Sequence, residues 1–161
     1  MIKIIQIPAL VDNYIYLIID QKTKKTACLD PAESELVLTY LKKNGLKLDY
    51  IFNTHHHLDH VGGNLKLKKN TGCKVVGSIN DKSRIPGIDI TLGNMEKFYL
   101  GSSYARIYET PGHTIGHICF HFEKDFALFC GDTLFSLGCG RMFEGSPKQM
   151  WNSLKLLRNL D

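Results

Sequence analysis

Residues Thr54–His60 read THHHLDH and contain four of the seven histidines in the chain, together with one aspartate. The segment before them, LDYIFN, is apolar and typical of a strand, so the histidines follow the end of that strand. Because side chains alternate along an extended chain, His55 and His57 project to one side and His56 to the other. Two imidazoles on one side can bind a single metal ion, which predicts a metal site where the strand ends.

Asp59 and His60 follow where the chain turns into a helix that we expect to begin near Val61. The adjacent Gly62-Gly63 pair lets backbone or a ligand approach closely. An aspartate and an imidazole from this turn can face a second ion beside the first, so H-x-H-x-D-H predicts a two-metal site. A lone His-x-His on a strand is usually an exposed pair, so this interpretation depends on the rest of the chain.

Two later segments add further polar candidates. ETPGHTIGH (Glu109–His117) places His113 in a Pro-Gly turn between two strands, from which it can complete a set of three histidines. FALFCGDTLF places Asp132 directly after an apolar strand, where its two oxygens can bridge two metal ions; in isolation the residue would be interpreted as a turn former. His117 and His121 are expected to be structural.

The pattern of apolar residues along the rest of the chain predicts an α/β domain built in layers. Nine short segments rich in Ile, Val, Tyr and Phe are expected as strands: Ile2–Ile7, Tyr14–Ile19, Thr26–Leu29, Tyr50–Asn53, Lys74–Gly77, Glu96–Leu100, Tyr104–Glu109, His117–Phe122 and Ala127–Cys130. Three helices are expected: Ser34–Lys43 ending before Asn44-Gly45, Val61–Lys69, and Pro147–Leu160 with Ser146 as N-cap. No repeat or linker is evident, and strands and helices mixed in this order indicate a single layered domain.

Composition excludes several classes of protein. Apolar residues make up 43% and charged residues 22% of the chain, and the net charge is only +4 with scattered lysines, so neither nucleic acid nor a membrane is expected as a partner. The five cysteines are odd in number and include no C-x-x-C pair. Reduced thiols in apolar strands indicate a cytoplasmic protein.

Three separated motifs now agree in order and spacing: T-H-x-H-x-D-H, T-P-G-H-T-x-G-H and G-D-T-L-F. Together they resemble the metallo-β-lactamase superfamily, which implies a four-layer αββα sandwich. Within it, ALVDNYIYLI and GDTLFSLGCGRMFEGSPKQMW look like the hydroxyacylglutathione hydrolase family, also called glyoxalase II. The resemblance covers residues 1–161 as one catalytic domain.

The resemblance implies a full ligand set, with one zinc-type ion on His55, His57 and His113, a second on Asp59 and His60, and Asp132 shared between them. Asp59 and Asp132 would also act in catalysis by orienting the attacking water. Iron and manganese accept the same donors as zinc.

The implied reaction is hydrolysis of S-(2-hydroxyacyl)glutathione, such as S-lactoylglutathione, as in methylglyoxal detoxification. A metal centre of this kind needs no serine nucleophile, and the sequence has no G-x-S-x-G motif. Arg141, in the glycine-rich loop, would bind a glutathione carboxylate; the alternative is an ordinary surface arginine. Phe143 falls where the family often has a tyrosine, so a hydroxyl contact is lost.

The sequence departs from the family at its C-terminal end. The family takes a further histidine for the second metal from beyond the last helix, followed by a helical domain, whereas no histidine follows His121 and the sequence given stops at Asp161. We therefore expect the C-terminal strands and the helical substrate-binding domain to be absent, the fold to be incomplete there, the second metal to bind weakly and turnover to be feeble.

Two other functions stay open at this point. The chain also resembles dioxygenases that act on glutathione persulfide, in which a single iron would bind His55, His57 and an aspartate. It can also be a truncated metal-binding domain with little turnover. The oligomeric state is not fixed by the sequence, and a monomer is expected.

Overall fold

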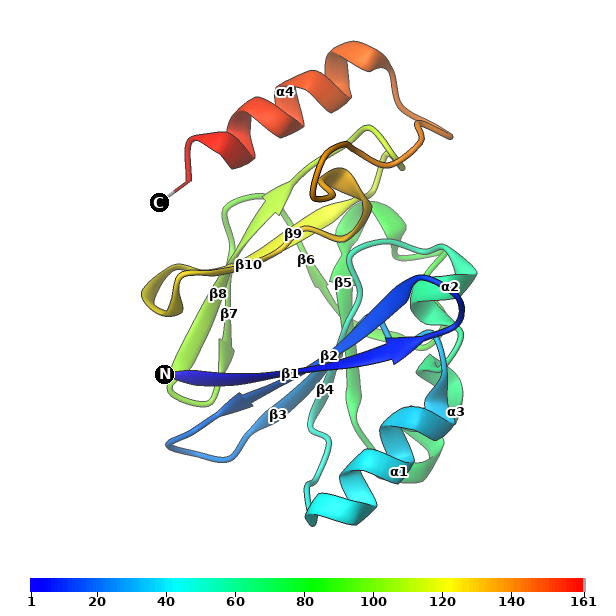
Figure 1. The fold of residues 1–161 in the computed structure, drawn as a ribbon, viewed down its shortest axis with the longest axis vertical. Coiled ribbons are helices and arrows are strands. Elements are labelled where there is room, and N and C mark those ends of the chain that lie inside the picture. Colours follow the sequence, from blue (N-terminus) through cyan, green and yellow to red (C-terminus); the bar gives the residue numbers. More distant parts are fainter. Residues whose placement is uncertain (161) are drawn as a thin grey trace.

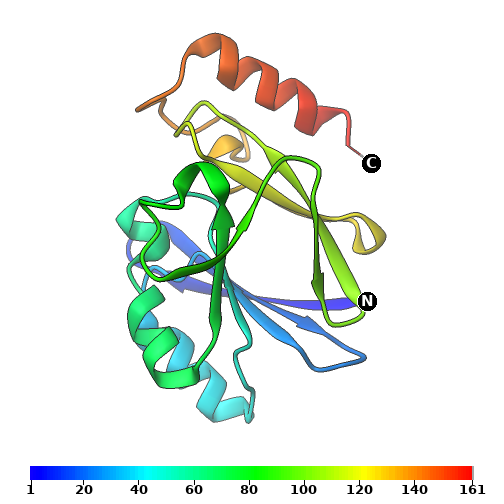
Figure 2. The same ribbon diagram turned by 180° about the vertical axis from the view of Figure 1, so that it is seen from behind.

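The computed structural model describes residues 1–160, which form two facing sheets with helices on both outer faces (Figures 1 and 2). The first sheet has the order β1 (Ile2–Ala9), β2 (Asn13–Asp20), β3 (Thr26–Leu29), β4 (Tyr50–Phe52), β5 (Lys74–Ser78) and β6 (Ile88–Leu92). The second has the order β10 (Ala127–Phe129), β9 (Ile118–Phe122), β8 (Ser103–Glu109) and β7 (Lys97–Leu100). The helices are α1 (Ser34–Asn44), α2 (Leu58–Val61), α3 (Asn64–Thr71) and α4 (Pro147–Arg158), with short 3-10 turns η1 (Ile79–Asp81), η2 (Glu123–Asp125) and η3 (Gly131–Thr133).

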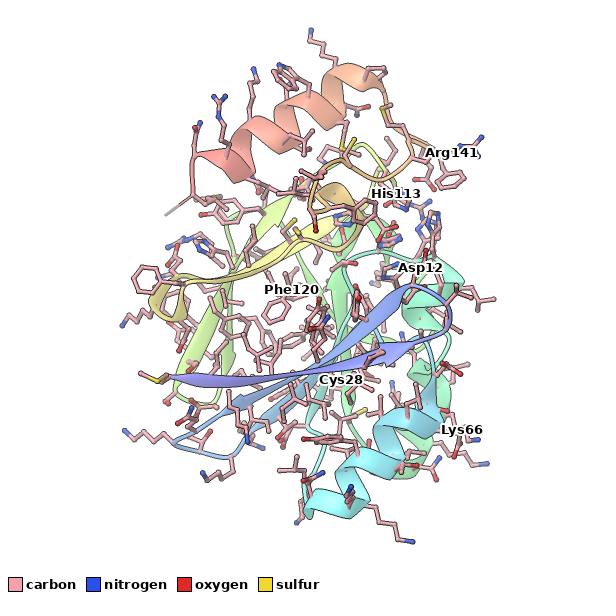
Figure 3. The ribbon with its side chains drawn as sticks, viewed as in Figure 1. Asp12, Cys28, Lys66, His113, Phe120 and Arg141 are labelled. Carbon is pink, nitrogen blue, oxygen red and sulfur yellow. The ribbon has the colours of Figure 1, made fainter. Side chains whose placement is uncertain are left out.

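The expected four-layer αββα sandwich is confirmed, because an apolar layer lies at each interface. Between the sheets, Phe52 and Phe120 stack with ring centroids 4.9 Å apart. Figure 3 shows Phe120 between the two sheets and Cys28 on the side of the first sheet that faces α1. On the far side of the second sheet, Leu157 of α4 packs with Tyr108 and other side chains. Alternate residues of each strand therefore serve different layers.

Strand direction brings the polar segments to one edge of the sandwich. β1 to β3 are antiparallel, whereas β3, β4, β5 and β6 run parallel. The carboxyl ends of parallel strands meet at the same edge, so Asp30 after β3 and Thr54 after β4 emerge together. The segments after β8 and β10 reach the same edge, as the contacts of His113 and Asp132 with the histidine-rich stretch show.

Helix ends follow the capping chemistry of the sequence. At α4, the Ser146 side chain accepts from the Gln149 N–H and the Gln149 side chain accepts from the Ser146 N–H, while Pro147 occupies the first turn, as expected. Gly45 ends α1 in the left-handed conformation. Among the described residues, no helix is both long and apolar enough to cross a membrane.

Two expectations about local structure are wrong. The helix expected at Val61–Lys69 is two helices: α2 begins at Leu58, α3 begins at Asn64, and Gly62 and Gly63 separate them. A Cβ on Gly62 would lie 2.7 Å from the carbonyl oxygen of Ala32, and Gly63 donates its N–H to the Pro31 oxygen at 2.7 Å. The glycines therefore admit neighbouring backbone, not a ligand.

The second error is the omission of β6, whose sequence IDITL carries an aspartate and follows a Pro-Gly turn. β6 pairs in parallel with β5 with an irregularity between Val75 and Val76. Asp89 stays outside the core and accepts the Val75 N–H at 2.8 Å, so its charge does not oppose strand formation.

Candidate metal centre

Three histidines from two distant segments converge at the edge of the sandwich. His55 is buried at the carboxyl end of β4, and His57 follows it with ring centroids 4.7 Å apart. His113 arrives from the turn after β8, and its Nε2 lies 3.0 Å from His57 Nδ1. One ring nitrogen from each of the three lies within 4.8 Å of the others, which is a spacing that a single metal ion can span.

Hydrogen bonds on the far side of two of the three rings, His113 and His55, fix which nitrogen faces the centre. His113 Nδ1 donates to the carbonyl oxygen of Arg141 at 2.5 Å, which leaves Nε2 directed at His57. His55 Nδ1 lies 3.0 Å from the Thr54 hydroxyl, which leaves its Nε2 free. Metal-binding histidines are commonly held in this way by a partner on the other ring nitrogen.

Asp132 links this cluster to a second one. Its Oδ1 lies 3.3 Å from His60 Nε2 and its Oδ2 lies 3.4 Å from His113 Nε2, so the two oxygens face one histidine of each expected site. His55, His60 and Asp132 also place one ligand atom each within 4.8 Å of the others. The backbone N–H of Asp132 donates to His117 Nε2 at 3.2 Å, which fixes the backbone from which the carboxylate projects.

Asp59 is the expected ligand that stands apart. It lies on α2, its side chain is 47% exposed, and neither of the two clusters includes it. Its Oδ2 lies 3.4 Å from His60 Nε2 and accepts a hydrogen bond from the Asn13 amide at 2.9 Å. These partners hold the pKa of Asp59 well below its ordinary value. The structure therefore places Asp59 beside His60, at the edge of the site, with its carboxylate held by Asn13 of β2.

Sequence reasoning missed Asp30, a buried carboxylate directly behind the centre. Asp30 Oδ2 lies 3.1 Å from His60 Nδ1 and accepts the Thr54 hydroxyl at 2.7 Å, while Oδ1 accepts the Thr54 N–H at 2.8 Å. One residue thus orients His60 directly and His55 through Thr54. The available signal was an aspartate at the end of the apolar strand TACLD, the same signal that identified Asp132.

Charge at the two clusters differs. Burial lowers the pKa of His55 well below its ordinary value, and the neighbouring imidazoles lower it further. Burial also acts to lower the pKa of His60, but nearby carboxylates outweigh it and raise that pKa to about 12. Asp30, Asp132 and Asp59 are the carboxylates that do so. The surroundings of His60 stabilise a positive charge, whether a proton or a metal ion supplies it.

The remaining histidines lie outside the two clusters. His56 turns away to Asp81, with Nδ1 3.2 Å from the carboxylate. His117 is buried and bonded through Nδ1 to the hydroxyls of Thr110 at 2.8 Å and Thr133 at 3.1 Å. His121 is buried, and its ring centroid lies 6.1 Å from that of Tyr108, which packs with Leu157 of α4.

The residues expected to contact substrate lie in the loop Gly138–Gly145, which we call the substrate loop. The Phe143 ring stands edge-on to His57 and His113, with centroids 5.4 and 5.3 Å away, and is 60% exposed. The Arg141 guanidinium lies 5.1 Å from that ring, and Figure 3 shows Arg141 at the surface beside His113. Gly140 is required here because a Cβ would lie 2.1 Å from the Asp132 carbonyl oxygen.

A cleft of about 830 Å³ opens on the side of the centre that carries His60. Its lining includes Asp59, His60 and Asp132 together with residues of β1, β2, β10 and the segment after β10. Much of this wall is apolar, including Tyr14, Tyr16, Phe129, Leu134 and Phe135. The centre is therefore open to a ligand that carries an apolar part.

The donor set fits divalent metal ions. His55 Nε2 is buried and has no hydrogen-bond partner among residues 1–160, and the carboxylate oxygens 3.3 and 3.4 Å from His60 Nε2 lack hydrogen-bond geometry. A buried polar atom without a partner is costly, and a metal ion between the clusters would satisfy both. Imidazole and carboxylate donors suit zinc, iron and manganese.

Fold and site together define the class of protein. The chain matches the Metallo-beta-lactamase superfamily over residues 15–96 and 99–161, and it belongs to that family. Membership implies divalent metal binding by the histidine and aspartate cluster.

Among curated relatives, the chain is 58% identical to the hydroxyacylglutathione hydrolase of Methylococcus capsulatus, over 99% of this chain and 62% of that one. Among solved structures, it resembles the B3 metallo-β-lactamase BLEG-1, with a TM-score of 0.84 and 25% identity over 96% of this chain and 84% of that one. It also resembles TTHA1623 in a di-iron-bound form, with a TM-score of 0.81 and 25% identity over 99% of this chain and 87% of that one. The chain spans 60–64% of the length of the first curated relatives it matches.

Proposed function

We propose that residues 1–161 are the metal-binding catalytic domain of a hydroxyacylglutathione hydrolase, which cleaves thioesters such as S-lactoylglutathione to glutathione and a 2-hydroxy acid. The observation that carries this proposal is the convergence of His55, His57 and His113 beside the substrate loop. The identity of 58% to a relative with that name supports the choice of substrate.

We propose that the chain binds two divalent ions, most simply zinc. His55, His57 and His113 would hold the first, His60 and Asp59 the second, and Asp132 would contact both. When bound, such ions lower the pKa of water to about 7 and polarise a carbonyl group. The second ion is expected to bind more weakly, because Asp59 stays exposed and does not converge with Asp132.

The chain's own residues would place the substrate. The Arg141 guanidinium is free to pair with a glutathione carboxylate, and the exposed Phe143 ring would pack on the thioester near His113. Asp132, held through its N–H by His117, would keep the attacking water in line with the carbonyl carbon. The leaving thiol has an ordinary pKa of about 8.5, so the thiolate departs without a strong general acid.

Hydrolysis of S-lactoylglutathione by the zinc-loaded chain tests the proposal, with loss of thioester absorbance as the readout. We expect a slow rate that exceeds the rate with free zinc and that disappears in His113→Ala. Oxygen uptake with glutathione persulfide would instead support the dioxygenase. Thioester loss no faster than with free zinc, at saturating metal, would reject the hydrolase.

A further inference from the structure

We infer that Arg84 is a positioning residue that joins the substrate loop to the histidine-rich stretch Thr54–His60. Arg84 follows η1, 24 residues beyond the last of those histidines, and carries no role in the metal clusters. Its guanidinium lies between two carboxylates, Asp81 on one side and Glu144 of the substrate loop on the other. The part of the inference that concerns substrate rests on the proposed function.

The first half of the connection runs from the histidine-rich stretch, through His56 and Asp81, to Arg84. Asp81 is fully buried, its Oδ2 lies 3.2 Å from His56 Nδ1, and its Oδ1 accepts from Arg84 Nε at 3.0 Å. Arg84 Nη1 also lies 3.4 Å from His56 Nε2. One neutral tautomer of His56 satisfies the contacts with Asp81 and Arg84, with Nδ1–H donating to Asp81 and Nε2 accepting from Arg84, while Glu144 Oε1 lies 3.5 Å from the same Nε2. Since His56 lies between His55 and His57, two expected metal ligands, its contacts with Asp81 and Arg84 also restrict the backbone that carries those ligands.

The second half runs from Arg84 to the substrate loop. Arg84 Nη1 donates to Glu144 Oε1, and Glu144 Oε2 accepts the Ile115 N–H at 2.8 Å. Burial acts to raise the pKa of Glu144, but the Ile115 N–H and Arg84 outweigh it and lower the pKa below its ordinary value. Glu144 is thus a charged acceptor bound from two sides, by Arg84 and by the turn that carries His113.

Close packing makes the connection rigid. A Cβ on Gly116 would lie 2.0 Å from Asp81 Oδ1, so the turn that carries His113 rests directly on the Asp81 carboxylate. Within residues 1–160, Glu144 is the one side chain of the substrate loop that hydrogen-bonds to another element. The other bonds of the loop to its surroundings involve its backbone, such as Phe143 N–H to His113 O at 3.1 Å. Arg84 therefore supplies the charged link that sets where Arg141 and Phe143 stand.

Arg84→Met tests the inference, with Arg106→Met as the matched control. Arg106 pairs with Glu123 at the outer face of the second sheet, where the two side chains are 22% and 28% exposed, against 33% and 25% for Arg84 and Glu144. Hydrogen exchange of a peptide covering the substrate loop reports loop order directly. We expect about tenfold faster exchange at the Phe143 and Gly145 amides in Arg84→Met and no change there in Arg106→Met, because a charge-assisted bond is lost.

Three further measurements keep the result clear. Glu144→Ala leaves Asp81 paired with Arg84, so it should fold even where Arg84→Met does not, and it should give the same local increase in exchange. In the zinc-loaded protein both variants should raise KM for the thioester about tenfold and change kcat less than about threefold, since substrate placement is weakened. Zinc content of the three-histidine site should stay the same.

Unchanged exchange in the substrate loop of both variants would overturn the inference, whatever the activity. Exchange that rises equally in the strands of both sheets would also overturn it, because that result indicates general destabilisation. If the wild-type chain hydrolyses no thioester, the proposed function fails, while the exchange result still decides the role of Arg84.

Discussion

The two candidate metal positions lie side by side, yet their ligands are held differently. At the first, His55 and His113 are buried, and His113 is locked by its bond to the Arg141 carbonyl. At the second, His60 is equally locked by Asp30, but Asp59 is 47% exposed and lies outside the cluster of His55, His60 and Asp132. The first position is preorganised by the fold of this chain, whereas the second is only partly so. Ligand identity alone does not make a metal site; partners behind each ligand do.

Removing a ligand from the first position should have the largest effect. A four-ligand zinc site is worth about 10–16 kcal/mol, or roughly 3 kcal/mol per ligand, so His113→Ala should weaken the tightest zinc more than 100-fold. Isothermal titration with zinc measures the change. His121→Ala is the control, since the His121 ring lies beside Tyr108, which packs with Leu157 of α4 away from the metal clusters. Equal affinity in both variants would show that His113 is no ligand.

Removing the carboxylate behind the centre should come next. Asp30→Asn should lower zinc affinity 10- to 100-fold, because it loosens the orientation of His60 and of Thr54 beside His55. Asp20→Asn changes an equally buried aspartate that binds Thr23 and Ser102 far from the centre, and it should leave zinc affinity unchanged while lowering stability. The comparison separates the orientation of ligands from general loss of stability. Equal zinc affinities in the two variants would contradict the orienting role of Asp30.

The two positions should also differ in proton release. The folded-state pKa of His60 is raised to about 12, so its proton stabilises the metal-free fold fully below the ordinary pKa of 6.5, and this contribution is lost as pH rises toward 12. Metal must displace that proton, so the second affinity should rise up to about tenfold per pH unit above 7. His55 and His57 have lowered pKa values and are already neutral, so the zinc affinity of the first position should not rise in this way.

Zinc titration in buffers of different ionisation enthalpy counts the protons released at each binding step. Equal proton release at both steps would contradict the expected difference between the two positions.

The smallest effect is expected from the tether of Asp59. Asn13→Ala removes one hydrogen bond to the exposed carboxylate, worth about 1 kcal/mol, so the second metal should weaken about fivefold and the first not at all. The same titration resolves both steps. A change confined to the first step would show that Asn13 serves the other position.

Parts of this arrangement follow from the sequence, and others depend on tertiary contacts. Alternation along an extended chain identified His55 and His57 as a pair and set His56 apart. The break between α2 and α3 was missed because the Gly62–Gly63 pair packs against the backbone of Pro31 and Ala32, a contact that no local pattern reveals.

Long-range partners explain the remaining gaps. Asn13 binds Asp59 from 46 positions away and Arg84 binds Glu144 from 60 positions away, so spacing within a motif carries no information about either contact. Asp30 has the same local signature as Asp132, a polar residue after an apolar strand, but only the parallel pairing of β3 with β4 shows that it faces His60.

Anomalous scattering at the zinc edge, from crystals of the chain grown with one equivalent of zinc, tests the central claim most directly. We predict one strong peak among the ring nitrogens of His55, His57 and His113, with Asp132 beside it. A second, weaker peak near His60 should grow only at higher zinc concentration. A principal peak elsewhere, or one held by Asp59 and His60 without His113, would contradict the assignment of the preorganised site.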